Sequence, residues 1–159
     1  MSATEPHSRA SERALCDLLA ALRALQQLHQ TTHWVVHGEP FYGDHLLYQR
    51  LYEAMGDEFD TLAEKVVAYF DEASVDLLSQ LDRMEEIAAK WDMATDCHVE
   101  RTLIAERHLQ DLIKKAYDLI SSNGEMSLGL DDYLMALANN HETNIYLIQQ
   151  KVRCDCDAE

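Results

Sequence analysis

The sequence predicts an all-α domain of four long helices, with a longer connection between the second and the third. Apolar residues recur every three or four positions along four stretches, which is the spacing of one buried helix face. Gly and Pro are scarce, with five and two copies among 159 residues, so the chain offers few tight turns. A chain of this length forms one ordinary domain with a full hydrophobic core.

The first two predicted helices form a hairpin. The first spans residues 11–37 and is ended by Gly38 and Pro40, since a glycine followed by a proline terminates a helix. We expect Asp44 to cap the second helix, which runs to about residue 71. The apolar positions of the two helices are Leu15, Leu18, Leu22 and Leu25, then Tyr48, Leu51, Tyr52, Met55, Phe59, Leu62, Val66 and Phe70.

The third and fourth predicted helices form a second hairpin. Residues 74–92 connect the two hairpins and hold a short helix or two. The third helix spans residues 95–121 and stops at Asn123-Gly124, and the fourth runs from Ser127 to about residue 152. A connection of this length can recross the bundle, and a four-helix bundle with one long crossover has the ferritin-like topology. The apolar positions of these helices are Leu103, Leu109, Leu112, Ile113, Ala116 and Ile120, then Leu130, Leu134, Leu137, Ile145 and Ile148.

The sequence therefore divides into a flexible tail over residues 1–10, the bundle over residues 11–153, and a second tail over residues 154–159. Four cysteines show neither a CxxC pair nor zinc-finger spacing. Two of them stand in the C-terminal tail, which is either a frayed, reduced end or a binder of a soft metal. The cysteines are Cys16, Cys97, Cys154 and Cys156.

The charge of the chain excludes some classes of function. Thirteen basic and 29 acidic residues give a net charge of −16, and no cluster of Lys or Arg offers the charge that phosphate binding requires. This argues against direct DNA binding and favours cations as ligands. No apolar run approaches the roughly 18 residues of a membrane span. The N-terminus lacks the apolar stretch of a secretory signal, so we expect a cytoplasmic protein.

Two clusters of side chains are candidate metal ligands. A polar or buried histidine face and a solvated acidic face are the alternatives for the two clusters. The first cluster has three histidines four residues apart on one helix face and a fourth past the turn: His29, His33, His37 and His45. The second is an acidic stripe with steps of four, three and four residues: Glu53, Asp57, Asp60 and Glu64.

The spacing of these residues predicts a site shared between subunits. The hairpin can bring His33 and His45 together, whereas Asp60 follows His45 by 15 residues, roughly 22 Å at about 1.5 Å per residue. One metal cannot span that distance within one chain. A two-fold dimer would place the two histidines of one chain over Asp60 and Glu64 of the other. No Glu is followed by His three residues later, so the Glu-x-x-His motif of sites inside one bundle is absent.

The combined pattern resembles the Dps family of miniferritins across residues 11–153. The segment over residues 141–147 is similar to the last helix of that family. The resemblance implies a twelve-subunit shell that oxidises Fe(II) to Fe(III), usually with hydrogen peroxide, and stores the ferric mineral. It implies that the ligands are His33, His45, Asp60 and Glu64, with Trp34 beside them. The matching residues are His33-Trp34, Gly38, Phe41, His45 and Asp60-Thr61-Leu62-Ala63-Glu64.

The chain departs from this family in two respects. Gln49 stands where many members have an acidic residue, which weakens the second iron position, and the Lys-rich tail of DNA-coating members is absent. We expect His29 and His37 to lie around the centre or on the surface. Two rival hypotheses are a nucleoid-associated, DNA-protecting structural protein with a weak metal site, and a helical interaction module whose acidic stripe is solvated.

Overall fold

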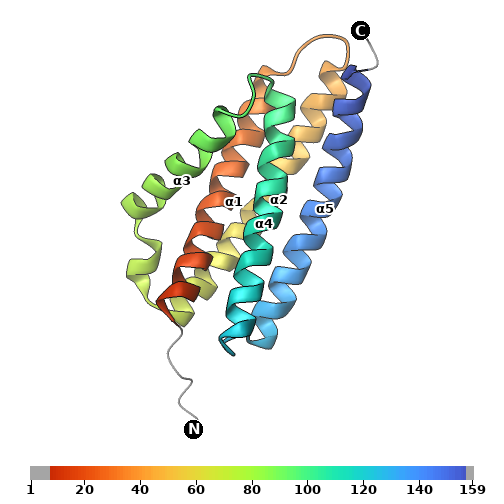
Figure 1. The fold of residues 1–159 in the computed structure, drawn as a ribbon. Helices are drawn as coiled ribbons and strands as arrows, with labels where there is room; N and C mark the ends of the chain where they lie inside the picture. Colours follow the sequence, from red (N-terminus) through yellow and green to blue (C-terminus); the bar gives the residue numbers. More distant parts are fainter. Residues whose placement is uncertain (1–7, 157–159) are drawn as a thin grey trace.

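Four long helices form a bundle, and a fifth lies against its outside (Figure 1). The computed structural model describes the backbone of residues 8–156 and the side chains of residues 8–152. Within that range the bundle consists of α1, α2, α4 and α5, so the predicted ferritin-like four-helix fold is confirmed. The elements are α1 (Arg9–Val35), α2 (Phe41–Tyr69), the 3-10 helix η1 (Glu72–Val75), α3 (Leu77–Asp92), α4 (His98–Ser122) and α5 (Leu128–Cys156).

The core lies along the bundle axis and is built from the predicted apolar stripes. Each of the four long helices contributes side chains that are almost fully removed from water. This burial is the main source of the stability of the bundle. Tyr52, Phe59, Phe70, Leu112 and Ile145 are only partly buried at its edges. Buried members of the core include Leu15, Leu18, Leu22, Leu25, Met55, Leu62, Leu109, Ile113, Leu130 and Leu134.

The turn between α1 and α2 differs from the prediction at both ends. Helix α1 ends at Val35, two residues early, and Gly38 turns the chain with a φ of 88°, a value that favours glycine. The Pro40 carbonyl accepts the first helical bond of α2 from the Asp44 amide at 3.0 Å. Asp44 therefore lies inside the first turn, and its predicted role as the N-cap is wrong. Its carboxylate instead pairs with Lys151 of α5 at 3.3 Å.

The second hairpin ends its helices with local hydrogen bonds. The Glu125 amide bonds to the Ile120 carbonyl at 3.0 Å, and Gly124 follows the helix with a φ of 70°. This is the Schellman arrangement, and the predicted stop is confirmed. The Ser127 hydroxyl accepts from the Leu130 amide at 3.1 Å and starts α5. Helix α4 begins three residues later than expected, whereas α5 continues to Cys156, into the range that we assigned to the C-terminal tail.

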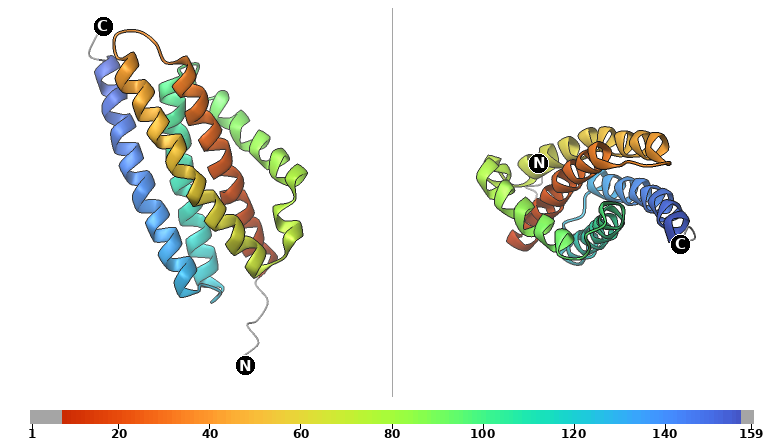
Figure 2. Two further views of the ribbon diagram at one scale, coloured as in Figure 1. Left: turned by 180° about the vertical axis from the view of Figure 1, so that it is seen from behind. Right: turned by 90° about the horizontal axis from the view of Figure 1, so that it is seen from above.

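Helix α3 occupies the predicted crossover and packs on the outside of α1 (Figure 2). It buries Met84, Ile87 and Trp91. The indole N–H of Trp91 donates to Nδ1 of His108 on α4 at 3.0 Å. Burial, and then the positive charges of Lys90 and Lys115, lower the pKa of His108. The lowered pKa keeps the acceptor nitrogen unprotonated. The crossover returns the chain, so α2 and α4 run in the same direction (Figure 1).

Candidate metal centre

Two imidazoles lie stacked at the end of the bundle where α1 turns into α2. His33 belongs to the last turn of α1 and His45 to the first turns of α2. Their ring centroids are 3.7 Å apart, with 23° between the ring planes. Tyr52 meets His33 edge-on at 5.3 Å, and Phe41 lies 5.1 Å from His45. The structure thus brings together the two histidines that the sequence analysis paired.

Reciprocal hydrogen bonds orient both rings. Nδ1 of His33 lies 2.8 Å from the backbone oxygen of His45, and Nδ1 of His45 lies 3.0 Å from the backbone oxygen of His33. Because a carbonyl oxygen only accepts, each Nδ1 carries the proton in these bonds. In the neutral form of each ring, Nε2 therefore keeps its lone pair. A ring tied through one nitrogen to a backbone carbonyl is the usual state of a histidine that binds metal through the other.

The two predicted carboxylate ligands stand apart from the stacked pair. Asp60 and Glu64 are exposed on α2, one helical turn from each other. Among the described residues neither has a hydrogen-bond or ion-pair partner, so both carboxylates are available to a cation. Residues 8–152 contain no group of three or more His, Cys, Asp or Glu side chains that could hold a metal ion. The four predicted ligands therefore do not come together within the part of one chain that the structure describes.

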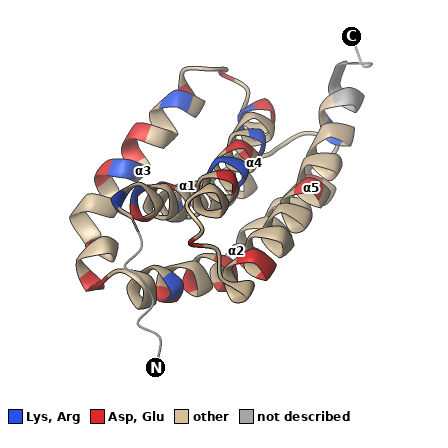
Figure 3. Ribbon diagram, turned by 60° about the horizontal axis from the view of Figure 1, so that its bottom comes forward, with Lys and Arg blue, Asp and Glu red and all other residues tan. Residues whose placement is uncertain are grey.

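The rest of the acidic stripe is also exposed, and acidic residues recur along α2 (Figure 3). The amide of Gln49, one turn after His45, donates to a Glu53 carboxylate oxygen at 2.9 Å. Gln49 is therefore tied to the stripe and contributes no charge of its own. His37 is exposed beyond the end of α1, and its Nδ1 donates to the Val35 carbonyl at 3.0 Å.

A second polar cluster, which the sequence analysis did not identify, lies inside the bundle. We call it the buried quartet. Nε2 of His29 lies 2.8 Å from one oxygen of Glu106, and Nδ1 of His141 lies 2.6 Å from the other. Nε2 of His141 lies 3.2 Å from Glu58. The members are His29 of α1, Glu58 of α2, Glu106 of α4 and His141 of α5.

Protonated imidazole nitrogens join the members of the quartet to one another. His29, Glu106 and His141 are fully buried. Burial opposes the charge on His141, but the hydrogen bonds that its ring donates to Glu106 and Glu58 outweigh it and raise the pKa of His141 to about 9. Burial likewise opposes the charge on Glu106, and bonds from His141 and His29 lower its pKa to about 2. His29 is thus neither a surface group nor part of the stacked pair, and its Nδ1 is buried without a hydrogen-bond partner.

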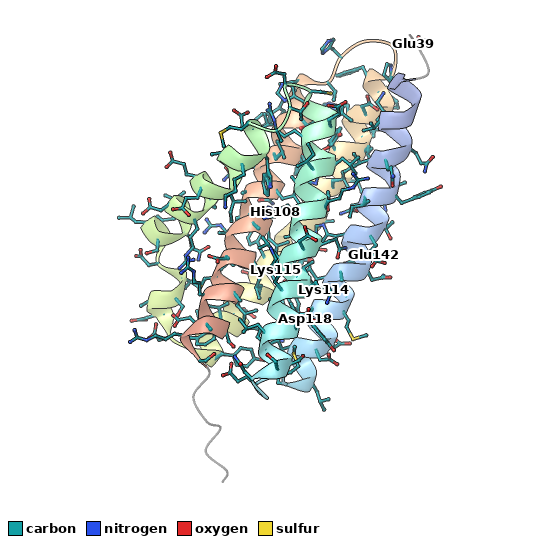
Figure 4. All side chains as sticks on the ribbon, viewed as in Figure 1. Glu39, His108, Lys114, Lys115, Asp118 and Glu142 are labelled. Atoms are coloured by element: carbon teal, nitrogen blue, oxygen red, sulfur yellow. The ribbon has the colours of Figure 1, made fainter. Side chains whose placement is uncertain are left out.

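The quartet left a signal in the sequence. Glu106 stands three residues after Leu103 and three before Leu109, on the buried face of α4, and His141 stands four residues after buried Leu137. Charged residues on an apolar stripe are rare unless they are paired. His141 is fully buried, whereas its neighbour Glu142 is exposed on α5 (Figure 4). The four residues come from four helices, so no local motif joins them.

The fold is that of Dps proteins. No protein-family model matches the chain, and no curated protein matches it by sequence. Among solved structures, DpsC from Streptomyces coelicolor superposes with a TM-score of 0.75 at 21% identity, over 89% of this chain and 83% of that one. Dps from Vibrio cholerae, described as one of the ferritin-like diiron-carboxylate proteins, gives 0.74 at 16%, over 96% and 99%. Dps from Listeria monocytogenes gives 0.71 at 17%, over 89% and 92%.

None of the helices, over the range that the structure describes, is long and apolar enough to cross a membrane.

Proposed function

We propose that the chain is a ferroxidase and iron-storage protein that assembles into a closed homo-oligomer of about twelve subunits. In this proposal Fe(II) and Fe(III) are substrate and product, and the mineral is kept inside the shell. The observation that carries it is the stacked pair of His33 and His45, whose two Nε2 lone pairs are left for a cation. The Dps fold supports it. The exposed, unpartnered carboxylates of Asp60 and Glu64 supply the second half-site.

The proposed centre combines His33 and His45 of one chain with Asp60 and Glu64 of another. Imidazole nitrogen and carboxylate oxygen together suit iron, and a set with two histidines and carboxylates leaves positions open for an oxidant. The carboxylates favour Fe(III) over Fe(II) because they stabilise the added positive charge. Two Fe(II) ions give two electrons to one hydrogen peroxide, and two protons complete two waters. Oxygen is the alternative oxidant. Oxidation in pairs releases no hydroxyl radical, so the reaction would relieve oxidative stress.

Exposed apolar side chains support assembly. Trp34, next to His33, is 66% exposed, and Tyr42 is 72% exposed at the same end. Leu77 and Leu78 at the start of α3 are exposed as well. A contiguous apolar surface on one chain marks a contact between chains, and we propose that these exposed side chains belong to such a surface. Trp34 therefore stands where a partner subunit would cover it, beside the proposed centre.

The proposed partners are iron, peroxide or oxygen, and further copies of the chain. Direct DNA binding is not part of the proposal, because the net charge is −16 and phosphate binding requires clustered Lys and Arg. We place the protein in the cytoplasm, where thiols stay reduced, in keeping with the free thiols of Cys16 and Cys97.

The direct test uses purified protein stripped of metal. We expect it to accelerate Fe(II) oxidation by peroxide and to hold many iron atoms per shell. Light scattering during gel filtration should give a mass near twelve subunits. A stable monomer under native conditions, or iron oxidation no faster than in buffer, would contradict the proposal. A DNA band shift in the absence of divalent metal would instead favour the DNA-protecting alternative.

A further inference from the structure

The buried quartet connects all four helices of the bundle through one chain of hydrogen bonds. It runs from His29 on α1 to Glu106 on α4, then to His141 on α5, and ends at Glu58 on α2. The proposed iron chemistry uses none of these residues. Each link is between 2.6 and 3.2 Å, and within the quartet only Nδ1 of His29 is buried without a hydrogen-bond partner.

Two further hydrogen bonds from α5 hold the end of the hydrogen-bond chain that lies on α2. Nδ2 of Asn140 donates to the second Glu58 oxygen at 3.1 Å, and the Tyr133 hydroxyl donates to the Glu58 backbone oxygen at 2.8 Å. Helix α2 makes much less contact with α5 than with α1. Polar bonds at Glu58 therefore fix α2 against α5 where apolar packing is thin.

Both ends of this chain of hydrogen bonds lie next to proposed ligands. Glu58 precedes Asp60 by two residues, which is about 200° around a helix, so Glu58 points into the bundle and Asp60 points out. His29 precedes His33 by one turn, about 40° around α1. Fixing the inner residue of each helix thereby fixes the direction of the outer ligand.

We propose that the buried quartet is a positioning network for the ferroxidase centre, which sets the rotation of α1 and α2 about their axes and so aims His33 and the Asp60–Glu64 pair. The inference rests on the proposed function. A side chain lies roughly 5–6 Å from its helix axis, so a rotation of about 10° moves a ligand atom by about 1 Å. A displacement of that size can cost about a hundredfold in rate. The quartet residues touch no substrate, so they are positioning residues.

The test compares three substitutions on α4. Glu106→Leu removes the middle of the hydrogen-bond chain and leaves an apolar side chain of similar size. Because His29 and His141 then lose their shared acceptor, we expect this variant to be less stable as well. Glu106→Gln keeps the connection, because its amide oxygen can accept from His29 and its amide N–H can donate to Nδ1 of a neutral His141. Thr102→Val is the matched control. Thr102 is buried one turn earlier and bonds to Tyr48 at 3.0 Å, and it lies outside the quartet.

Three properties are measured on assembled shells: the kcat and KM for Fe(II) oxidation, the visible spectrum of bound Co(II), and the midpoint of urea unfolding. We expect Glu106→Leu to lose at least about tenfold in kcat and to give an altered cobalt spectrum. Glu106→Gln and Thr102→Val should keep both near wild type, even if Thr102→Val unfolds at lower urea. A wild-type kcat and cobalt spectrum in Glu106→Leu would overturn the inference, as would rates that simply follow the unfolding midpoints.

A milder variant covers the case in which Glu106→Leu fails to assemble. Tyr133→Phe with Asn140→Ala removes the two supporting bonds to Glu58 and leaves the four quartet residues in place. We expect a loss of about threefold to tenfold in kcat, with a smaller change in KM. An unchanged kcat in this variant would overturn the inference. Failure of the proposed function itself would be distinct, because the wild-type shell would then neither oxidise Fe(II) nor bind Co(II).

Discussion

The stacked pair and the buried quartet use the same kinds of side chain to different ends. In the stacked pair the two rings bond to backbone carbonyls, and each Nε2 lone pair is left over. In the quartet the ring nitrogens of His141 both face carboxylates, and little remains for an outside ligand. The partner of the imidazole decides its role, since a carbonyl fixes one nitrogen and frees the other, whereas two carboxylates hold both protons in place.

Removing one ligand from either half-site should give the largest effect, which is on the rate of iron oxidation. Glu64→Gln and His33→Ala should each lower fast iron oxidation by about a hundredfold or more while the shell still assembles, because each removes one ligand. Co-assembly of the two variants from unfolded chains should recover part of the rate. Some interfaces would then pair intact histidines of one chain with intact carboxylates of the other. No recovery, measured by stopped-flow absorbance, would mean that the centre is not shared between subunits.

Breaking the quartet should lower the stability of the fold more than breaking a half-site does. Glu106→Ala leaves His29 and His141 buried without their acceptor, which costs about 3–5 kcal/mol when one partner of a buried charged network is lost. His33→Ala removes one hydrogen bond at the bundle end and should cost about 1 kcal/mol. Urea unfolding at one fixed protein concentration compares the two. Equal losses would contradict the distinction between the two regions.

The quartet should make the stability of the fold depend on pH. His141, with its pKa raised from 6.5 to about 9, stabilises the fold fully below pH 6.5 and loses that effect as the pH rises through 9. Glu106, with its pKa lowered from 4.5 to about 2, contributes fully above pH 4.5 and loses its effect as the pH falls toward 2. We expect a plateau between pH 4.5 and 6.5 and a fall of the order of a few kcal/mol by pH 9–10.

Unfolding midpoints of wild type and His141→Gln at pH 6, 7.5 and 9 check this dependence. The variant should be less stable at pH 6 and should change less between pH 6 and 9. A wild-type midpoint that rises over that interval would show that other groups dominate.

Adding a carboxylate beside the two histidines should give the smallest change in stability. Gln49→Glu places a carboxylate four residues after His45 and replaces the bond to Glu53 with repulsion, at a few tenths of a kcal/mol. We expect anaerobic titration with Co(II) to show an increase from about one toward about two metal ions per centre. Gln49→Ala is the control, since it removes the amide without adding charge. An unchanged stoichiometry in Gln49→Glu would mean that residue 49 does not face the metal.

The sequence predicts the parts of this molecule that depend on local pattern. The four stripes, the crossover, and the stops at Gly38 and Gly124 follow from spacing and backbone preference, and the proximity of His33 and His45 follows from the short turn. The N-cap assignment of Asp44 failed because Pro40 can start the helix earlier.

The quartet was missed for a different reason. Its members lie 77, 35 and 83 residues apart along its three bonds, so only tertiary packing reveals that Glu106 meets His29 and His141. The iron-binding role of His33, His45, Asp60 and Glu64 stays a prediction for the same reason. In the proposal, the four residues come together only between copies of the chain, and no partner copy is part of the structure.

The bond from His45 to the backbone of His33 also serves the helix that precedes it. The carbonyl of His33 belongs to the last turn of α1, where the oxygens of a helix lack partners from the helix itself. The imidazole of His45 supplies one of the missing donors and so caps α1 from the next helix. Any mutation at position 45 therefore removes a candidate ligand and loosens the end of α1 in the same step. A lineage that no longer needed iron oxidation would still be selected to keep a donor there, so the histidine could outlast the activity.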